Sequence, residues 1–187
     1  MDSDSISRGL SDRARFEALY ASCQKAIFGY VLRRVTRPED GADVIAETFL
    51  VAWRRLDEVP DGEEACLWLY GVARRALANQ RRGEQRRTAL AERLRAELVT
   101  APAVYEAESR LGEIVGALAS LTESERELLR LEGWEGLDAG QIATVLGISQ
   151  NAVRIRLHRA RKRLARELAT RDRDTVASAT AVRGETR

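Results

Sequence analysis

The sequence predicts an all-α protein with two small helical domains joined by a flexible linker. Apolar residues recur three or four positions apart along most of the chain, and no alternating strand pattern of useful length interrupts them. The stretch from Val99 to Tyr105, VTAPAVY, breaks the helical pattern with Pro102. We therefore place a domain boundary there and expect residues 10–95 and 111–169 to fold as separate domains, with 96–110 as the linker.

Three helices are expected in the first domain. The first runs from Asp12 to Val35, with an apolar stripe formed by Phe16, Tyr20, Cys23, Ile27 and Val31. A capping-box pattern over Thr36–Glu39, with Pro in the first turn, predicts the start of the second helix. Its stripe is Ile45, Phe49, Ala52 and Leu56, and the segment VPDG ends it. A third helix follows Asp61, so three stripes can close a small bundle with Trp53 and Trp68 partly inside.

The second domain contains a helix-turn-helix pattern. Three residues have the chemistry of helix N-caps and precede short apolar stripes: Thr122, Asp138 and Ser149. Gly147 lies between the last two helices, where it can supply the turn, and Val153, Leu157 and Leu164 are expected to point inward. Beyond about Ala169 neither a stripe nor an aromatic residue remains, so residues 170–187 are predicted to be a disordered tail.

Charge is divided into blocks along the chain, although the formal net charge is only +2. Between Pro38 and Glu64 nine acidic residues face two arginines. Between Ala73 and Arg95 eight arginines face two acids, and from Ser149 to Arg173 nine basic residues face two acids. Solvated helix faces alone do not predict two basic blocks with an acidic block upstream. The pattern favours two contacts with a polyanion and one surface of a different kind.

The second helix of the helix-turn-helix carries side chains suited to duplex DNA. A recognition helix enters the major groove with its N-terminal residues first, so Gln150, Asn151 and Arg154 are best placed for base edges and the later basic residues for phosphates. The predicted contact residues are Gln150, Asn151, Arg154, Ile155, Arg156, His158, Arg159, Arg161, Lys162 and Arg163. His158 is expected to face DNA or solvent, because no residue is positioned to make it a ligand or a base.

Other classes of protein are disfavoured. No apolar run approaches the roughly 18 residues that span a bilayer, and the N-terminal sequence MDSDSISRGLSD has no signal-peptide core, so a cytoplasmic protein is expected. Cys23 and Cys66 each lie within an apolar helical pattern, and we expect reduced core thiols rather than metal ligands. No nucleophile is paired with a base and no acidic cage suggests a metal, so no enzyme, cofactor or metal is predicted.

Two parts of the chain together resemble the extracytoplasmic-function (ECF) sigma factors. Their domain 2 is similar to RPEDGADVIAETFLVAWRRL, Arg37 to Leu56, followed by WLYGVARRALANQRR, Trp68 to Arg82. Their domain 4 is similar to LTESERELLRLEGWEGLDAGQIATVLGISQNAVRIRLHRARKRL, Leu121 to Leu164. The resemblance covers about Arg15 to Leu168, with both halves in the family's order and a linker between them.

The resemblance implies a non-catalytic subunit that binds core RNA polymerase, directs it to promoter DNA and helps to open the duplex. The segment Asp43–Arg55 would dock on the clamp of the polymerase's largest subunit through Asp43, Glu47, Phe49, Trp53 and Arg54. The melted minus-ten element would be held by Trp68, Tyr70, Arg74, Arg75, Asn79, Arg81 and Arg82, and the helix-turn-helix would read the minus-thirty-five element. An anti-sigma factor is a further partner that the family brings. For Trp68 and Tyr70, plain core packing stays open.

The chain departs from the family at three positions, and one rival hypothesis stands. Ala46 replaces the Gln of a QETF signature, which bears on one clamp contact. Arg75 and Asn79 stand where Asn and then Asp are frequent, which bears on the minus-ten base preference. The rival is a dimeric helix-turn-helix repressor or activator that acts without polymerase. It would need a ligand pocket or dimer surface within residues 10–95, where the helices end in an arginine block instead.

Overall fold

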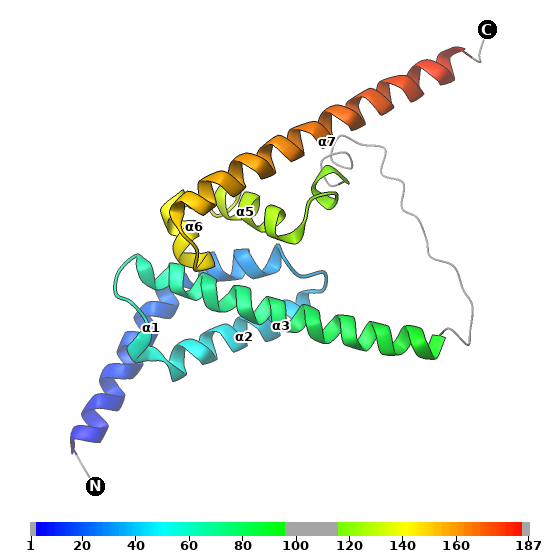
Figure 1. Ribbon diagram of the computed structural model, residues 1–187. Helices are drawn as coiled ribbons and strands as arrows, with labels where there is room; N and C mark the ends of the chain where they lie inside the picture. The colour runs from blue at the N-terminus through cyan, green and yellow to red at the C-terminus, as the bar shows by residue number, and fades with distance from the viewer. Residues whose placement is uncertain (1–2, 96–115, 185–187) are drawn as a thin grey trace. The chain divides into compact units, whose positions relative to one another are not determined.

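The protein is helical throughout the part that the structure describes, as the sequence predicted. The computed structural model describes the backbone of residues 3–95 and 116–184, and side chains within 11–85 and 116–171. The helices are α1 (Ser3–Leu32), α2 (Pro38–Arg54), a 3₁₀ turn η1 (Leu56–Glu58), α3 (Glu64–Arg95), α5 (Glu123–Gly133), α6 (Ala139–Leu146) and α7 (Gln150–Gly184) (Figure 1). The chain divides into two compact units between Thr100 and Ala101, which are described one at a time. The predicted linker, residues 96–110, lies outside the described residues.

In the first unit α1, α2 and α3 pack against one another, each against both others (Figure 1). The predicted stripe of α1 is confirmed at Cys23, Ile27 and Val31, all of which are fully buried. Burial of apolar surface is the main favourable term here, at about 25 cal/mol per Å² removed from water. The expected three-helix bundle is therefore present, and its core runs along the inner faces of all three helices.

An aromatic cluster holds α2 on α1. The Phe49 ring is buried, with its centroid 4.7 Å from that of Tyr20 and 6.4 Å from those of Phe16 and Phe28. Trp53, one turn later, packs edge-on against Phe16 at 5.2 Å but leaves 45% of its surface exposed. Edge-on and tilted pairs at these separations add to the stabilisation from burial. Phe49 thus supports α2 from inside, while Trp53 is shared between the cluster and solvent.

The start of α2 differs from the predicted capping box at Thr36. The N-cap is Arg37, which has an extended backbone and makes no side-chain capping bond. Pro38 occupies the first turn, and a residue before proline favours this extended conformation. The Arg37 guanidinium donates instead to both carboxylate oxygens of Asp40, which lowers the pKa of that carboxyl. The predicted capping-box bond was wrong because proline moved the helix start by one residue.

The expectation of two reduced core thiols is also wrong. Cys23 of α1 and Cys66 of α3 form a disulfide, with Cα atoms 5.5 Å apart and 43 positions between them in the sequence. Cys23 is fully buried, whereas Cys66 is only partly buried. Neither residue has a local sequence signal for pairing. Only the packing of α1 against the first turn of α3 brings the two sulfur atoms together.

In the second unit all three predicted N-caps are confirmed. Thr122 and Glu125 form a complete capping box, in which the side chain of each residue accepts a hydrogen bond from the backbone N–H of the other. The Asp138 carboxylate accepts from the backbone N–H of Gln141 at 2.8 Å, and the Ser149 hydroxyl accepts from that of Ala152 at 3.2 Å. These bonds satisfy backbone donors that have no partner within the helix.

The helix-turn-helix is formed by α6 and the first part of α7. Gly147 between them has φ +66°, a left-handed conformation that glycine adopts without steric cost. Ile142, Val153 and Leu157 are buried. Helix α5 packs against α7, so the recognition helix has a buried support along its inner side.

The predicted disordered tail, residues 170–187, is contradicted for most of its length. Helix α7 continues to Gly184, without a break at Ala169. The segment holds arginines and alanines, which favour helix, and contains no proline. Extending an existing helix avoids the cost of a new nucleus, so an amphipathic stripe is not needed.

The buried aromatic cluster yields a first prediction. Phe49→Ala is expected to lower the free energy of unfolding by about 3–5 kcal/mol, because it removes a buried ring and leaves a cavity. Leu50→Ala is the matched control, since Leu50 is the next residue of α2 and 46% exposed. Urea unfolding followed by circular dichroism measures both. Equal losses for the two variants would contradict the assignment of Phe49 to the core.

Candidate nucleic-acid interface

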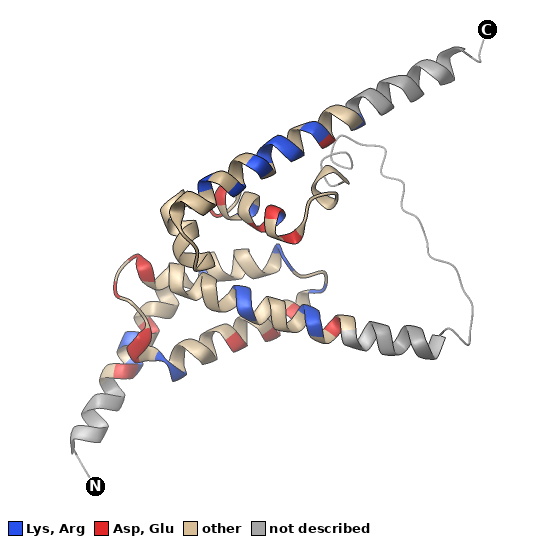
Figure 2. Ribbon diagram, in the orientation of Figure 1, with Lys and Arg blue, Asp and Glu red and all other residues tan. Residues whose placement is uncertain are grey.

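The outer face of α7 carries most of the side chains predicted to contact DNA. Val153, Leu157 and Ala160 are buried on the inner face and fix which residues face outward. The exposed residues are Gln150, Asn151, Arg154, Ile155, Arg156, His158, Arg159, Arg161 and Lys162. Figure 2 shows the basic residues following one another along the first half of α7. The structure thus presents a continuous basic surface on the helix predicted to enter the groove.

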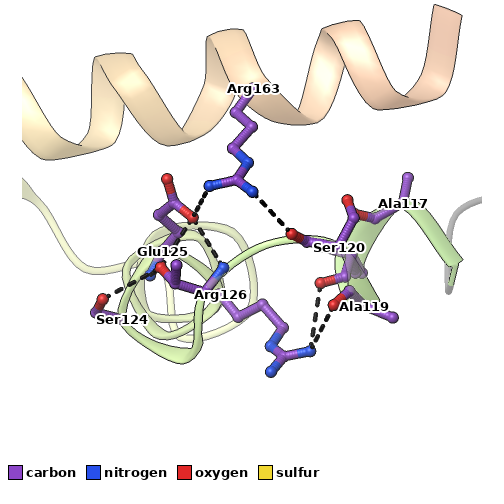
Figure 3. Close-up of polar contacts among 9 residues, drawn as sticks. Ala117, Ala119, Ser120, Ser124, Glu125, Arg126 and Arg163 are labelled. Atoms are coloured by element: carbon purple, nitrogen blue, oxygen red, sulfur yellow. Dashed lines mark hydrogen bonds and ion pairs between the residues drawn. The ribbon is translucent and has the colours of Figure 1, made fainter. Parts of the chain in front are cut away.

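Arg163 is an exception among the predicted DNA-contacting residues. Its guanidinium is partly buried and reaches back to the start of α5, where Nη1 lies 3.3 Å from a carboxylate oxygen of Glu125. Nη2 donates to the backbone carbonyl of Ser120 at 3.2 Å (Figure 3). Arg161 is paired as well, since its Nε donates to Glu132 at 3.1 Å, but more of that pair is exposed. Arg163 therefore joins α7 to α5, and its contact with DNA stays a prediction.

Glu125 connects this tether to the capping box of α5. One carboxylate oxygen accepts at 2.8 Å from both the backbone N–H and the hydroxyl of Thr122, and the same oxygen faces Arg163. The pKa of Glu125 is lowered, chiefly by the Thr122 backbone N–H, then by the Thr122 hydroxyl and by the charge of Arg163. The ionised carboxylate is thus held more firmly in the folded protein than in the unfolded chain.

A second basic face lies along α3. Trp68, Arg75, Asn79 and Arg82 follow one another at spacings of seven, four and three residues, which places them on one side of the helix. Trp68 is partly exposed and the other three are exposed. Arg82 donates to the side-chain oxygen of Asn79, and the Arg55 guanidinium lies 5.8 Å from the Trp68 ring centroid. The stripe is about 21 Å long at 1.5 Å per residue.

The remaining residues predicted for the melted strand are divided between surface and core. Arg74 is exposed beside Arg75. Arg81 is half-buried and donates to the carbonyl of Arg34 at 3.3 Å. The Tyr70 ring packs against that of Tyr30 of α1, with centroids 5.1 Å apart. Of the two alternatives left open for the aromatic residues, the core contact describes Tyr70, while Trp68 keeps an exposed edge.

The outer face of α2 combines acidic and apolar side chains. Asp43, Glu47, Trp53 and Arg54 are exposed, whereas Phe49 points into the aromatic cluster. Leu50 was not among the predicted docking residues, although it is 46% exposed and lies on the same side of α2 as Glu47 and Arg54. The sequence did carry a signal for its exposure, because Leu50 lies outside the predicted buried stripe that contains Phe49. The face is therefore two carboxylates, two apolar side chains and one arginine.

One further exposed aromatic residue was not singled out from the sequence. Trp134, at the end of α5, is 52% exposed, and the Arg130 guanidinium lies 5.7 Å from its ring centroid.

Among the residues that the structure describes, no cluster of three or more His, Cys, Asp or Glu side chains could hold a metal ion. None of the described helices is long and apolar enough to cross a membrane.

These faces define a helical DNA-binding protein with two basic modules, and comparison with known proteins identifies the family. Residues 19–87 match sigma-70 region 2, and residues 111–164 match sigma-70 region 4. The ECF RNA polymerase sigma factor SigL of Mycobacterium tuberculosis is 32% identical over 154 residues, which are 80% of this chain and 86% of SigL. The RNA polymerase sigma-E factor of Streptomyces avermitilis is 29% identical over 164 residues, which are 87% of this chain and 89% of that protein.

Solved structures agree on the fold. The sigma factor RpoE, in a co-crystal with the anti-sigma factor NepR from Bartonella quintana, superposes with a TM-score of 0.62 at 22% identity, over 82% of this chain and 96% of RpoE. CnrH in complex with the cytosolic domain of CnrY gives a TM-score of 0.57 at 25% identity, over 83% of this chain and 88% of CnrH. The chain belongs to the sigma-70 family, and within it to the ECF RNA polymerase sigma factors.

The Arg163 tether yields a prediction on stability. Arg163→Ala is expected to lower the free energy of unfolding of the second unit by about 1–2 kcal/mol, because it removes two partly buried hydrogen bonds, one to Glu125 of α5 and one to the Ser120 carbonyl just before that helix. Arg159→Ala, an exposed change one turn earlier on the same helix, should stay within about 0.5 kcal/mol of the wild type. Urea unfolding of the full chain and its variants tests this. Equal stability of the two variants would show that Arg163 does not join the helices.

The lowered pKa of Glu125 yields a prediction on pH dependence. A carboxyl whose pKa is lower in the folded than in the unfolded state stabilises the fold above its unfolded value of about 4.3. That contribution is lost as pH falls through the lower folded value. The melting temperature of the wild type should therefore exceed that of Glu125→Gln at pH 6, and the difference should shrink as the pH is lowered below about 4.3. A difference that does not change with pH would rule out this contribution.

Proposed function

We propose that this ECF sigma factor divides its work among three helix faces. The outer face of α2 docks on the clamp of the largest subunit of core RNA polymerase. The face of α3 that begins at Trp68 holds the melted minus-ten strand, and the outer face of α7 reads the minus-thirty-five element as duplex. The domains would be residues 10–95 and 111–169, joined by 96–110. The protein would act in the cytoplasm, and all polymerisation chemistry would belong to the core enzyme.

The single observation that carries the proposal is the separation of charge among these helices. The α2 face offers the carboxylates of Asp43 and Glu47 together with Leu50 and Trp53, which suits a protein partner and repels DNA. The outer faces of α3 and α7 are basic (Figure 2). DNA, a polyanion, attracts the basic faces of α3 and α7 and repels the acidic face of α2. Docking and DNA binding can therefore occur together without competing for one surface.

The two basic faces differ in the form of DNA that they suit. The α3 stripe pairs a partly exposed indole with exposed arginines, and an unstacked strand can be held by stacking on an aromatic ring together with charge on its backbone. On α7 the residues near the N-terminal end are polar or cationic, which suits hydrogen bonds to base edges in a major groove. Tyr70 and Arg81 would support the α3 stripe from the core, and Arg163 would support α7.

An anti-sigma factor is proposed as a further partner. Two of the similar solved structures, RpoE and CnrH, are complexes with NepR and with the cytosolic domain of CnrY. An occupant of the α2 face would prevent docking on the polymerase. The rival dimeric regulator has no comparable support, because both matched regions are those of sigma-70 proteins.

The proposal is tested by adding the purified protein to sigma-free core polymerase and a library of genomic fragments. Sequencing the transcript starts should reveal a common pair of upstream elements that is absent with core alone. A protein that gave no new starts, yet bound a palindromic site tightly without core, would instead be the dimeric regulator.

Recognition of the upstream element yields a prediction for Arg154. Arg154→Ala should relax base preference at one position, at a cost of about 1–3 kcal/mol. Arg159→Ala should weaken binding to all sequences alike. It should also reduce the slope of log affinity against log salt concentration by about one, as expected for the loss of one phosphate contact. Competition among promoter variants bound by the complete polymerase, at several salt concentrations, separates the two effects. Equal losses that do not depend on sequence would remove Arg154 from base recognition.

Docking on the polymerase yields a prediction for α2. Glu47→Lys should weaken association with core at least tenfold, because it reverses a charge at the centre of the proposed docking face. Asp57→Lys is the control, since it reverses an exposed charge on η1, beyond the end of α2. Exposed charges usually change stability by less than about 0.5 kcal/mol, so both variants should stay folded. Titration of core with labelled protein measures the affinities. The same affinity for both variants would contradict docking through α2.

A further inference from the structure

A pocket in the first unit ends at the disulfide. It has a volume of about 580 Å³, and its lining includes Cys66 but not Cys23. The pocket lies between α1 and the connection that leads from α2 to α3. This volume is within the range of small-molecule sites, about 300–1,000 Å³. Cys23 is completely buried on the other side of the bond, so solvent molecules meet the disulfide from the Cys66 side.

We propose that Cys66 is a site of thiol–disulfide exchange with a low-molecular-weight thiol that enters this pocket. A thiolate attacks the Sγ atom of Cys66, the bond between Cys66 and Cys23 breaks, and Cys23 leaves as a thiolate that takes up a proton. A second thiol then attacks the mixed disulfide and releases Cys66. Two small thiols are oxidised to their disulfide while the protein disulfide is reduced to two thiols. The reverse sequence, starting from the oxidised small molecule, closes the bond again.

The walls of the pocket suit a small amino-acid-like thiol. Ala18 of α1 and Ala65 of α3 are small residues that line the pocket together with Cys66. Charges of both signs line the pocket, because Arg15 contributes a guanidinium, and Asp61 and Glu63 contribute carboxylates. Arg15 donates to Asp61 at 3.2 Å and to the Val59 carbonyl at 2.9 Å. A thiol that carries an ammonium and a carboxylate finds partners for both.

Exchange at Cys66 has a mechanical consequence. Cys66 lies in the first turn of α3, two residues before Trp68, and the disulfide fastens that turn to α1. Opening the bond removes a cross-link between segments that lie 43 positions apart. Disulfides in cytosolic proteins are usually transient or redox-sensing. A regulatory effect of opening the Cys23–Cys66 bond on transcription rests on the proposed function. The exchange itself does not, because its chemistry needs neither polymerase nor DNA.

The test begins with the oxidised full chain and glutathione. Samples are quenched with acid during reduction, and the mixed disulfide is located by mass spectrometry of peptides. We expect glutathione on the Cys66 peptide at least tenfold more often than on the Cys23 peptide. Adducts mainly on Cys23, or a chain that keeps two free thiols even in excess glutathione disulfide, would overturn the proposal.

Two variants show whether the pocket is the route. Ala18→Trp fills part of the pocket and should slow reduction by glutathione at least tenfold. Ala14→Trp is the control, because Ala14 is exposed one turn earlier on α1 and does not line the pocket. Equal rates for the two variants would contradict entry through the pocket. Reduction should also lower the melting temperature of the wild type by several degrees, and an unchanged value would contradict a switch. A chain that passes these tests but gives no transcript starts would disprove only the proposed function.

Discussion

The burial of one face of each helix is the constraint on which the other features depend. A helix exposes whatever lies opposite its buried stripe, so the core residues determine the functional surface as much as the exposed residues do. In α2 the buried Phe49 ring, 4.7 Å from Tyr20, sets the rotation that turns Glu47 and Leu50 outward. In α7 the burial of Val153 and Leu157 does the same for Arg154. A rotation of either helix would expose core residues and bury charged side chains.

Charge has two uses on the same helix. Arg154 and Arg159 are exposed and can meet a polyanion, whereas Arg163 is partly buried against Glu125 and Ser120 and stabilises the position of α7. The difference matters because an ion pair that is partly buried and hydrogen-bonded loses more on truncation than an exposed one. The basic block predicted from the sequence is thus an exposed group followed by a tether. The tether adds to the buried contacts of Val153 and Leu157 that hold α7 in place.

The sequence predicted what local chemistry decides. The all-helical class, the three N-caps of the second unit and the Gly147 turn follow from residue type and spacing over a few positions, and so does the buried stripe of α1. The Cys23–Cys66 disulfide could not be predicted in this way, because 43 residues separate the partners and only packing brings them together. The role of Arg163 depends on a contact with Glu125, 38 positions away, for the same reason. The helix over residues 170–184 was not predicted, because that segment has no apolar stripe to bury. A helix can nevertheless extend from an already formed helical segment without such a stripe.

We propose that separate faces hold duplex DNA upstream and melted strand downstream only when core polymerase arranges them. Chemical footprinting of one promoter fragment with the protein alone, with core alone and with both tests this most directly. The protein alone should give weak or no protection. With core present, two elements should be protected and the downstream one should show single-stranded reactivity. Tight protection of a palindromic site by the protein alone, unchanged by core, would contradict it.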